Sequence, residues 1–191
     1  MGARDRILDT AYDLFSRHGI RAVGVDRIVA ESGVAKMSLY RHFPSKDILV
    51  LTFLQEREKR WTNEWLRSEV EARAATPAER MLAIFDVFGE WFLIDDFEGC
   101  SFINVLLEFD DRGNPIRQAS VVHLSNIRDF LRELATEAGA SDPVALAHQW
   151  HILMKGSIVA AGEGDRLAGQ RAQEIGRLLL EHEAIAVHAA G

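Results

Sequence analysis

The segment GVAKMSLYRHFPSKDIL, residues 33–49, carries the pattern that decides the fold. Gly33 is placed to end one short helix, because glycine readily adopts the left-handed conformation found after helix C-termini. Pro44 ends the next helix, since a proline disfavours helical geometry in the residue before it. Ser45 is positioned to cap a third, longer helix. The segment therefore predicts a tight turn between two short helices, with a long helix directly after them.

Two short helices over residues 25–32 and 36–42, joined by a three-residue turn, form a helix-turn-helix pattern. Leu39 and Phe43 lie four residues apart, so both face the core formed with an earlier helix. In this motif the second helix enters the major groove of DNA. The side chains expected to contact phosphates or base edges are Arg27, Lys36, Met37, Ser38, Tyr40, Arg41, His42 and Lys46.

The stretch from Ala11 to Leu49 resembles the helix-turn-helix region of the tetracycline-repressor (TetR) family of transcriptional regulators, and the likeness is greatest over residues 33–49. The resemblance implies a DNA-binding regulator whose larger helical part binds a small molecule and dimerises through its last two long helices. It also implies DNA-contacting roles for particular residues of this chain, with Tyr40 and His42 mainly on the backbone: Lys36, Ser38, Tyr40, His42 and the phosphate-contacting Lys46.

The sequence departs from that family at three points. Val23 and Gly24 replace the usual Thr or Ser before the second helix, and Ala35 replaces a common Ser at the start of the third helix. Met37 stands where a small residue is common. We expect these differences to affect which operator is read, and not DNA binding itself.

The charge of the chain is unevenly distributed. The 191 residues carry a net charge of −7, which at first disfavours a nucleic-acid partner. Residues 1–48, however, contain 8 Lys and Arg against 6 Asp and Glu, whereas residues 49–191 contain 14 against 23. Because a phosphate-binding surface needs only local positive charge, the N-terminal part remains compatible with DNA.

The composition predicts a folded protein of the cytoplasm. Hydrophobic residues make up 48% of the chain, which disfavours disorder, and the single cysteine excludes an internal disulfide. The sequence has neither an apolar run of 18 residues nor a signal-peptide pattern, so no membrane partner is expected. Helical spacing of apolar residues throughout predicts an all-α fold of about nine helices, divided into residues 1–48 and residues 49–191.

The larger part is rich in aromatic residues in segments that we expect to surround one interior. They can line an apolar pocket for an effector, or they can simply pack the core; both interpretations remain open. The candidate ligand-binding residues are Trp61, Trp65, Phe85, Phe88, Trp91, Cys100, Phe102, Asn104, His123, Trp150 and His151.

Two of the polar candidates have alternative interpretations. Cys100 stands at the start of an expected short helix, where a thiol can have a lowered pKa, so it is either a redox sensor or a small buried residue. His148 and His151 share a helix face, but no set of Cys or carboxylate residues completes a metal site. We therefore expect neither a metal nor a cofactor.

The last two helices have apolar faces that predict a four-helix dimer interface, with ordinary packing within one chain as the alternative. A helix-turn-helix protein commonly reads two half-sites about 34 Å apart, which favours the dimer. The candidate interface residues are Trp150, Met154, Ile158, Ile175, Leu178 and Leu179.

Together these features predict a homodimeric, ligand-responsive regulator that binds double-stranded DNA. We expect a repressor released from a palindromic operator by a small apolar or aromatic effector. The alternatives are a ligand-binding or protein-interaction module without operator binding, and a redox sensor acting through Cys100. An enzyme is not expected, because no nucleophile motif such as G-x-S-x-G or H-E-x-x-H is present.

Overall fold

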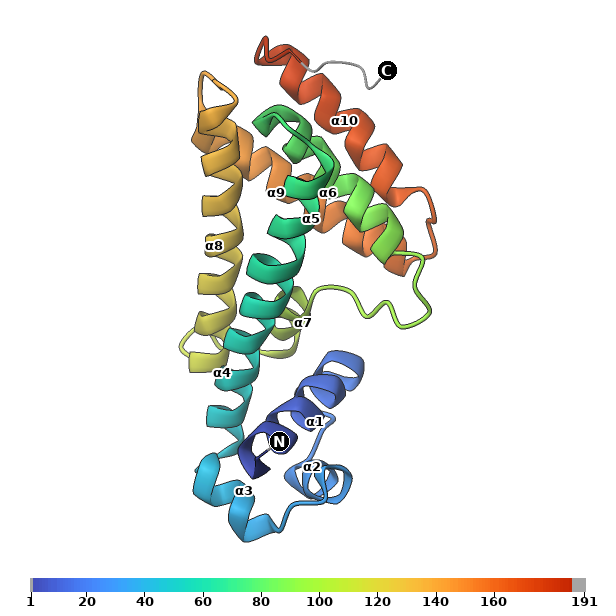
Figure 1. Ribbon diagram of the computed structural model, residues 1–191. Coiled ribbons are helices and arrows are strands. Elements are labelled where there is room, and N and C mark those ends of the chain that lie inside the picture. Colours follow the sequence, from blue (N-terminus) through green and yellow to red (C-terminus); the bar gives the residue numbers. More distant parts are fainter. Residues whose placement is uncertain (1, 187–191) are drawn as a thin grey trace. The chain divides into compact units, whose positions relative to one another are not determined.

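The computed structural model describes residues 2–186, which form helices and the loops between them, without any strand. The helices are α1 (Ala3–His18), α2 (Val25–Ser32), α3 (Lys36–His42), α4 (Lys46–Arg57), the π-helical stretch η1 (Glu58–Leu66), α5 (Arg67–Arg73), α6 (Pro77–Trp91), α7 (Ser101–Glu108), α8 (Pro115–Glu137), α9 (Pro143–Gly162) and α10 (Ala168–His182) (Figure 1). Because α4, η1 and α5 follow one another without a break, these residues contain nine separate helical segments. The predicted all-α fold is confirmed.

Local sequence signals explain where several of these helices begin and end. Gly33 ends α2 in the left-handed conformation, with φ of 62°. The Ser45 hydroxyl accepts a hydrogen bond from the Ile48 amide at 3.2 Å and so caps α4. Thr76 and Glu79 form a reciprocal capping box at the start of α6. These caps satisfy amide groups that would otherwise lack partners at the helix ends.

The chain forms two compact units, each made from two separate segments. Unit 1 contains the described residues up to Arg60 together with Cys100–Leu124, and unit 2 contains Trp61–Gly99 together with the described residues from Ser125 onward. Unit 1 thus combines the N-terminal helices with α7 and the first half of α8. The expected domain boundary between residues 48 and 49 stays a prediction.

The core of unit 1 lies between α1 and the three helices that follow it (Figure 1). The rings of Tyr12 and Phe15 each pack edge-on against Phe53, with centroids 5.5 Å apart. Leu39 and Phe43 are buried, as the sequence pattern predicts. This burial fixes the rotation of α3 about its axis and hence determines which of its side chains face outward.

In unit 2, α10 packs against both α6 and α9 (Figure 1). A Cβ atom added at Gly169 of α10 would lie 2.8 Å from the Phe85 carbonyl oxygen of α6, so glycine permits the close approach of these two backbones. Trp150 of α9 is fully buried, and its ring lies 5.4 Å from that of Phe85.

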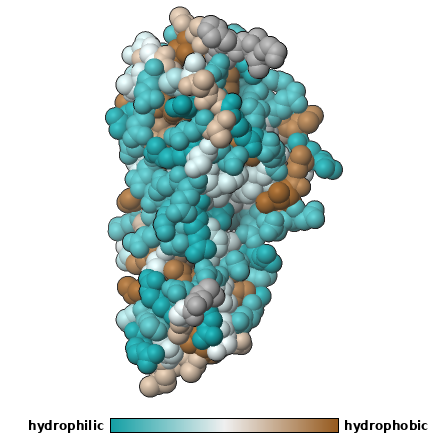
Figure 2. Space-filling model, in the orientation of Figure 1, coloured by the Kyte–Doolittle hydropathy of each residue, from teal (hydrophilic) through white to brown (hydrophobic). Residues whose placement is uncertain are grey.

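The face of the described chain that Figure 2 draws is largely polar. Figure 2 shows hydrophobic residues scattered among hydrophilic ones on the face drawn. None of the described helices combines the length and apolar character needed to span a membrane.

Candidate nucleic-acid interface

Helix α3 presents its polar and extended side chains outward. Met37 is 87% exposed and Tyr40 is 44% exposed, whereas Leu39 on the opposite face is fully buried. Arg41 is exposed and donates a hydrogen bond from its guanidinium to the Ser38 hydroxyl at 3.1 Å. The other predicted DNA-contacting residues of this helix are Lys36, which is exposed, and His42, which is half-buried.

Two basic residues, Arg27 of α2 and Lys36 of α3, form ion pairs within the motif. The Lys36 ammonium lies 2.6 Å from an Asp26 carboxylate oxygen, and this hydrogen bond raises the pKa of Lys36. Arg27 pairs with Glu31 at 2.7 Å and also contacts the His18 ring. All these groups are largely exposed, and exposed ion pairs contribute little to stability. Lys36 and Arg27 can therefore exchange these partners for phosphates at small cost.

The turn between α1 and α2 is held by two side chains from distant parts of the sequence. The Glu108 carboxylate at the end of α7 accepts hydrogen bonds from the amides of Ile20, at 2.9 and 3.1 Å, and Arg21, at 3.0 Å. The Lys46 ammonium donates to the Ile20 carbonyl at 2.6 Å. Gly19 has φ of 78°, and a Cβ atom there would collide with the Glu108 carboxylate.

The environment of Lys46 differs from that of an exposed phosphate-binding lysine. Its side chain is half-buried, and this burial lowers its pKa, while the charge of Glu108 acts in the opposite direction. The Ile20 carbonyl occupies one of its three N–H donors. Sequence reasoning missed the role of Glu108. The residue pattern of α7 does not indicate that its last side chain contacts the turn between α1 and α2.

Four of the predicted ligand-binding residues belong to unit 1. His123 of α8 stacks on Phe102 of α7 with ring centroids 5.1 Å apart, and its Nδ1 lies 2.7 Å from a Glu58 carboxylate oxygen. Cys100 is buried immediately before α7, and Asn104 is half-buried within it. Through Phe102 and Glu58, His123 connects α7 and α8 to the junction of α4 with η1.

The remaining candidates lie in unit 2. Trp61, Trp65 and Trp91 form a connected cluster, with ring centroids 5.3 to 6.2 Å apart, and Phe88 adjoins it. Phe85 and the neighbouring α9 residues Trp150 and His151 are buried. The structure thus brings the aromatic residues together as mutually packed rings; their binding of an effector stays a prediction.

The residues predicted for dimerisation differ in how exposed they are. Trp150, Met154 and Ile158 are buried within the chain, whereas Ile175 and Leu178 of α10 are 48% and 62% exposed and Leu179 is half-buried. Sequence reasoning missed the exposed apolar residues of α9, which are Val144, Ile152 and Val159.

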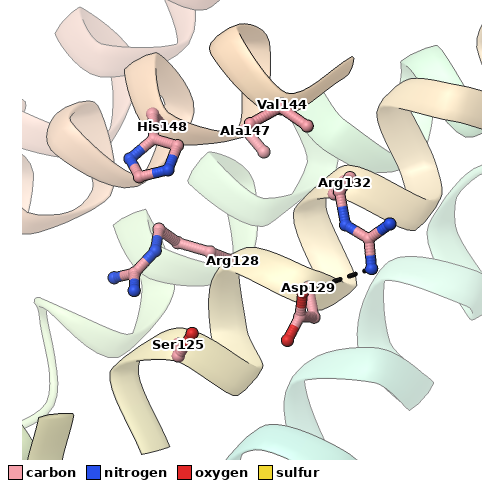
Figure 3. Close-up of a pocket in the computed structure, with 7 residues that line it drawn as sticks. All are labelled: Ser125, Arg128, Asp129, Arg132, Val144, Ala147 and His148. Carbon is pink, nitrogen blue, oxygen red and sulfur yellow. Dashed lines mark hydrogen bonds and ion pairs between the residues drawn. The ribbon is translucent and has the colours of Figure 1, made fainter. Parts of the chain in front are cut away.

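A pocket of about 320 Å³ lies between α8 and α9 in unit 2, and none of the residues predicted to bind a ligand lines it (Figure 3). The α8 side contributes Ser125, Arg128, Asp129 and Arg132, and the α9 side contributes Val144, Ala147 and His148. Across residues 2–186, no group of three or more His, Cys, Asp or Glu side chains is arranged to hold a metal ion.

Comparison with known proteins places this geometry in context. Residues 7–52 match the family described as bacterial regulatory proteins of the tetR family, and residues 77–175, more than half of the chain, match the tetracyclin repressor-like C-terminal domain. The HTH-type transcriptional regulator YjdC of Escherichia coli is 24% identical over 158 residues, covering 81% of each chain. LmrA of Bacillus subtilis, also an HTH-type transcriptional regulator, is 30% identical over 73% of this chain and 74% of its own.

A solved structure agrees with these matches. The crystal structure of a TetR-family transcriptional regulator from Streptomyces coelicolor superposes with a TM-score of 0.84 at 29% identity, covering 95% of this chain and 96% of that one. The fold and the exposed face of α3 define a helix-turn-helix transcriptional regulator. More specifically, the chain belongs to the TetR family.

Proposed function

We propose that this regulator is a repressor that binds a palindromic operator as a homodimer and is released from it by a small apolar or aromatic effector. It acts by binding, without catalysis, in the cytoplasm. The observation that carries the proposal is the outer face of α3, where Met37, Tyr40 and Arg41 are exposed on a helix anchored through the buried Leu39. Such a helix can enter the major groove without repacking the protein core.

The chemistry of that face suits both parts of DNA recognition. Arg41 and Lys36 supply the positive charge that phosphates attract, whereas Met37 offers an apolar side chain to a thymine methyl group. The amide groups at the start of the 12-residue α4, together with Lys46, add donors for a neighbouring phosphate. Phosphate contacts set the register, and base contacts set the sequence preference.

Release by an effector requires a connection between the effector site and α3. Glu108 supports one such connection, because it ties the end of α7 to the turn that precedes α2. The stacked pair of Phe102 and His123 fastens the other end of α7 to α8. An effector that displaces α7 would thus shift the turn, and effector and operator would weaken each other's binding by the same factor.

For dimerisation we propose the exposed faces of α9 and α10. Ile152 is 67% exposed and Leu178 is 62% exposed, values that are high for large apolar side chains. Gly156 lies one turn after Ile152, with nothing within 4 Å of a Cβ atom built there, so a partner helix could approach closely. Two copies related by a two-fold axis would bury this surface in a four-helix interface.

The operator proposal is tested with the double variant Tyr40→Ala/Arg41→Ala. Fluorescence anisotropy is measured on the DNA fragment upstream of the protein's own gene over a range of salt concentrations. We expect operator affinity to fall at least about tenfold and the salt slope to decrease by about one, because a phosphate contact is lost.

The matched control is Arg112→Ala, which removes an exposed arginine of unit 1 outside the helix-turn-helix motif and should leave both quantities unchanged. An unchanged affinity and salt slope in the double variant would show that α3 does not dock as proposed. Absence of any complex with the unaltered protein would favour the alternative of a module without operator binding.

A further inference from the structure

The pocket between α8 and α9 has an unusual charge for this chain. Its lining includes Arg128, Arg132 and His148 but only one acidic residue, Asp129, although the chain as a whole carries a net charge of −7. Figure 3 shows the three basic side chains on the two helices that border the pocket. Asp129 is already engaged, since the Arg132 guanidinium lies 3.2 Å from its carboxylate.

Because Asp129 pairs with Arg132, Arg128 has no acidic partner among the residues that line the pocket. Its side chain is half-buried, and within the part of the chain that the structure describes its guanidinium forms neither a hydrogen bond nor an ion pair. A guanidinium carries five N–H donors in a planar fork that matches a carboxylate or phosphate. A partly buried arginine without a counter-ion, at the border of a pocket, is what an anion-binding site requires.

His151 of α9 is not part of the pocket lining, but it lies close enough to the basic residues there to be affected by their charges. His151 follows His148 by three residues and is only 2% exposed, and its Nδ1 has no hydrogen-bond partner among the described residues. Burial, together with the charges of Lys155, Arg128 and His148, lowers the pKa of His151 to about 3. Its imidazole is therefore neutral at pH 7, and the lowered pKa reflects the positive charge that Arg128, His148 and Lys155 place around it.

The pocket also has an apolar wall. Val144 and Ala147 line it from α9, and Ser125 adds a hydroxyl group from α8. Its volume of about 320 Å³ lies at the lower end of the range found for small-molecule sites, about 300–1,000 Å³. A small molecule with one anionic group and one apolar ring or chain fits this combination better than an inorganic anion does.

We propose that this pocket binds a small organic carboxylate, with the carboxylate on the Arg128 guanidinium and the apolar group against Val144 and Ala147. His148, at the exposed edge, supplies a further N–H donor to the bound anion. The site is distinct from the aromatic cluster around Trp61 and Trp91. Its existence does not depend on operator binding by α3.

The test is isothermal titration calorimetry of the full chain, free of DNA, with sodium benzoate as the probe. We expect saturable binding with one site per chain in the unaltered protein. Arg128→Gln should weaken the binding at least about tenfold, because a charge-assisted bidentate contact is lost. Arg128→Lys keeps the charge but lacks the fork, so its affinity should fall between those two.

Two matched controls make the result specific. Arg112→Gln makes the same charge change on the surface of unit 1 and should leave benzoate binding within about twofold. Benzamide, which has the shape of benzoate without its charge, should bind at least about tenfold more weakly. Inorganic phosphate should also bind more weakly than benzoate, because it makes no use of the apolar wall.

Three results would overturn the proposal: no saturable binding of benzoate up to 10 mM, equal binding by Arg128→Gln and the unaltered protein, or phosphate binding as tightly as benzoate. Since DNA is absent, a failure here leaves the proposed operator binding untouched. Equally, a failure of the Tyr40→Ala/Arg41→Ala test leaves the carboxylate site standing.

Discussion

At the scale of single residues, burial changes the chemistry of His151 more than the sequence reveals. An imidazole at the surface titrates near pH 6.5, whereas the pKa of His151 in the folded chain is about 3. Burial disfavours the imidazolium, and three positive neighbours from α8 and α9 add to that effect. The sequence pattern indicates only that His148 and His151 share a helix face.

This shift predicts a pH dependence of stability. Between pH 6.5 and 3 the unfolded chain binds a proton at His151 that the folded chain does not, so the free energy of unfolding falls as the pH is lowered through this window. His151→Leu should reduce the slope between pH 6 and 4.5 by up to about 1.4 kcal/mol per pH unit. The measurement is urea denaturation at each pH and one protein concentration.

The control for this experiment is Gln149→Leu, which alters an exposed, uncharged side chain of the same helix, removes no titrating group and should leave the slope as in the unaltered chain. If His151→Leu retained the full slope, the loss of stability in acid would have to arise from other groups.

At the scale of helices, sequence reasoning succeeded where a local signal sets the structure. Gly33, Pro44 and Ser45 each act on neighbouring residues, so the helix-turn-helix boundaries could be predicted from residues 33–49 alone. The π-helical hydrogen bonding over Glu58–Leu66 has no comparable local signal, and the sequence predicted only a long helix after Ser45 without this irregularity.

The packing of α10 against α6 depends on a missing side chain, which gives a second prediction. Gly169→Ala would place a Cβ atom 2.9 Å from the Gly89 backbone nitrogen and Cα, atoms that cannot yield without moving α6. We expect the free energy of unfolding to fall by about 1–3 kcal/mol, measured by urea denaturation.

Gly162→Ala is the matched control, since its Cβ atom would have nothing within 4 Å and lies in the last turn of α9. There the lower backbone entropy of alanine should raise stability by up to about 1 kcal/mol. Equal effects of the two substitutions would mean that α6 and α10 are not held at close approach.

At the scale of the whole molecule, the fold class could be predicted from the sequence more completely than the exposed faces and the pocket. Helical periodicity and the motif of residues 33–49 sufficed for an all-α regulator. Which face of α9 is exposed depends on how tertiary contacts rotate the helix: Trp150 turns inward to Phe85, and Ile152 is left outside. The pocket beside Arg128 likewise depends on tertiary structure, because its lining residues come from both α8 and α9.

If the homodimer forms through the exposed apolar faces of α9 and α10, charged side chains introduced there should dissociate it into monomers. In Ile152→Glu/Leu178→Glu, two exposed apolar side chains become carboxylates that would be costly to bury in an interface. We expect sedimentation velocity to show a shift from dimer to monomer, with operator binding lost in parallel.

Leu107→Glu provides the control, because Leu107 is 80% exposed on α7 and belongs to unit 1. That variant should sediment as the unaltered protein does. A double variant that remained dimeric would place the contact between copies on some other surface.

The hydrogen bonds from the Ile20 and Arg21 amides to the Glu108 carboxylate have a consequence for the recombination of segments between regulators. The DNA-binding helices are not encoded as a self-contained unit, because the residue that fixes the turn between α1 and α2 is encoded about 90 codons further on. A hybrid protein that joins these N-terminal helices to the C-terminal part of a relative would contain the DNA-binding helices but would lack the Glu108 contact that holds their turn. Recombination that preserves function therefore has to transfer Cys100–Leu124 together with the N-terminal helices. Otherwise the recipient protein must already have a carboxylate at the position of Glu108.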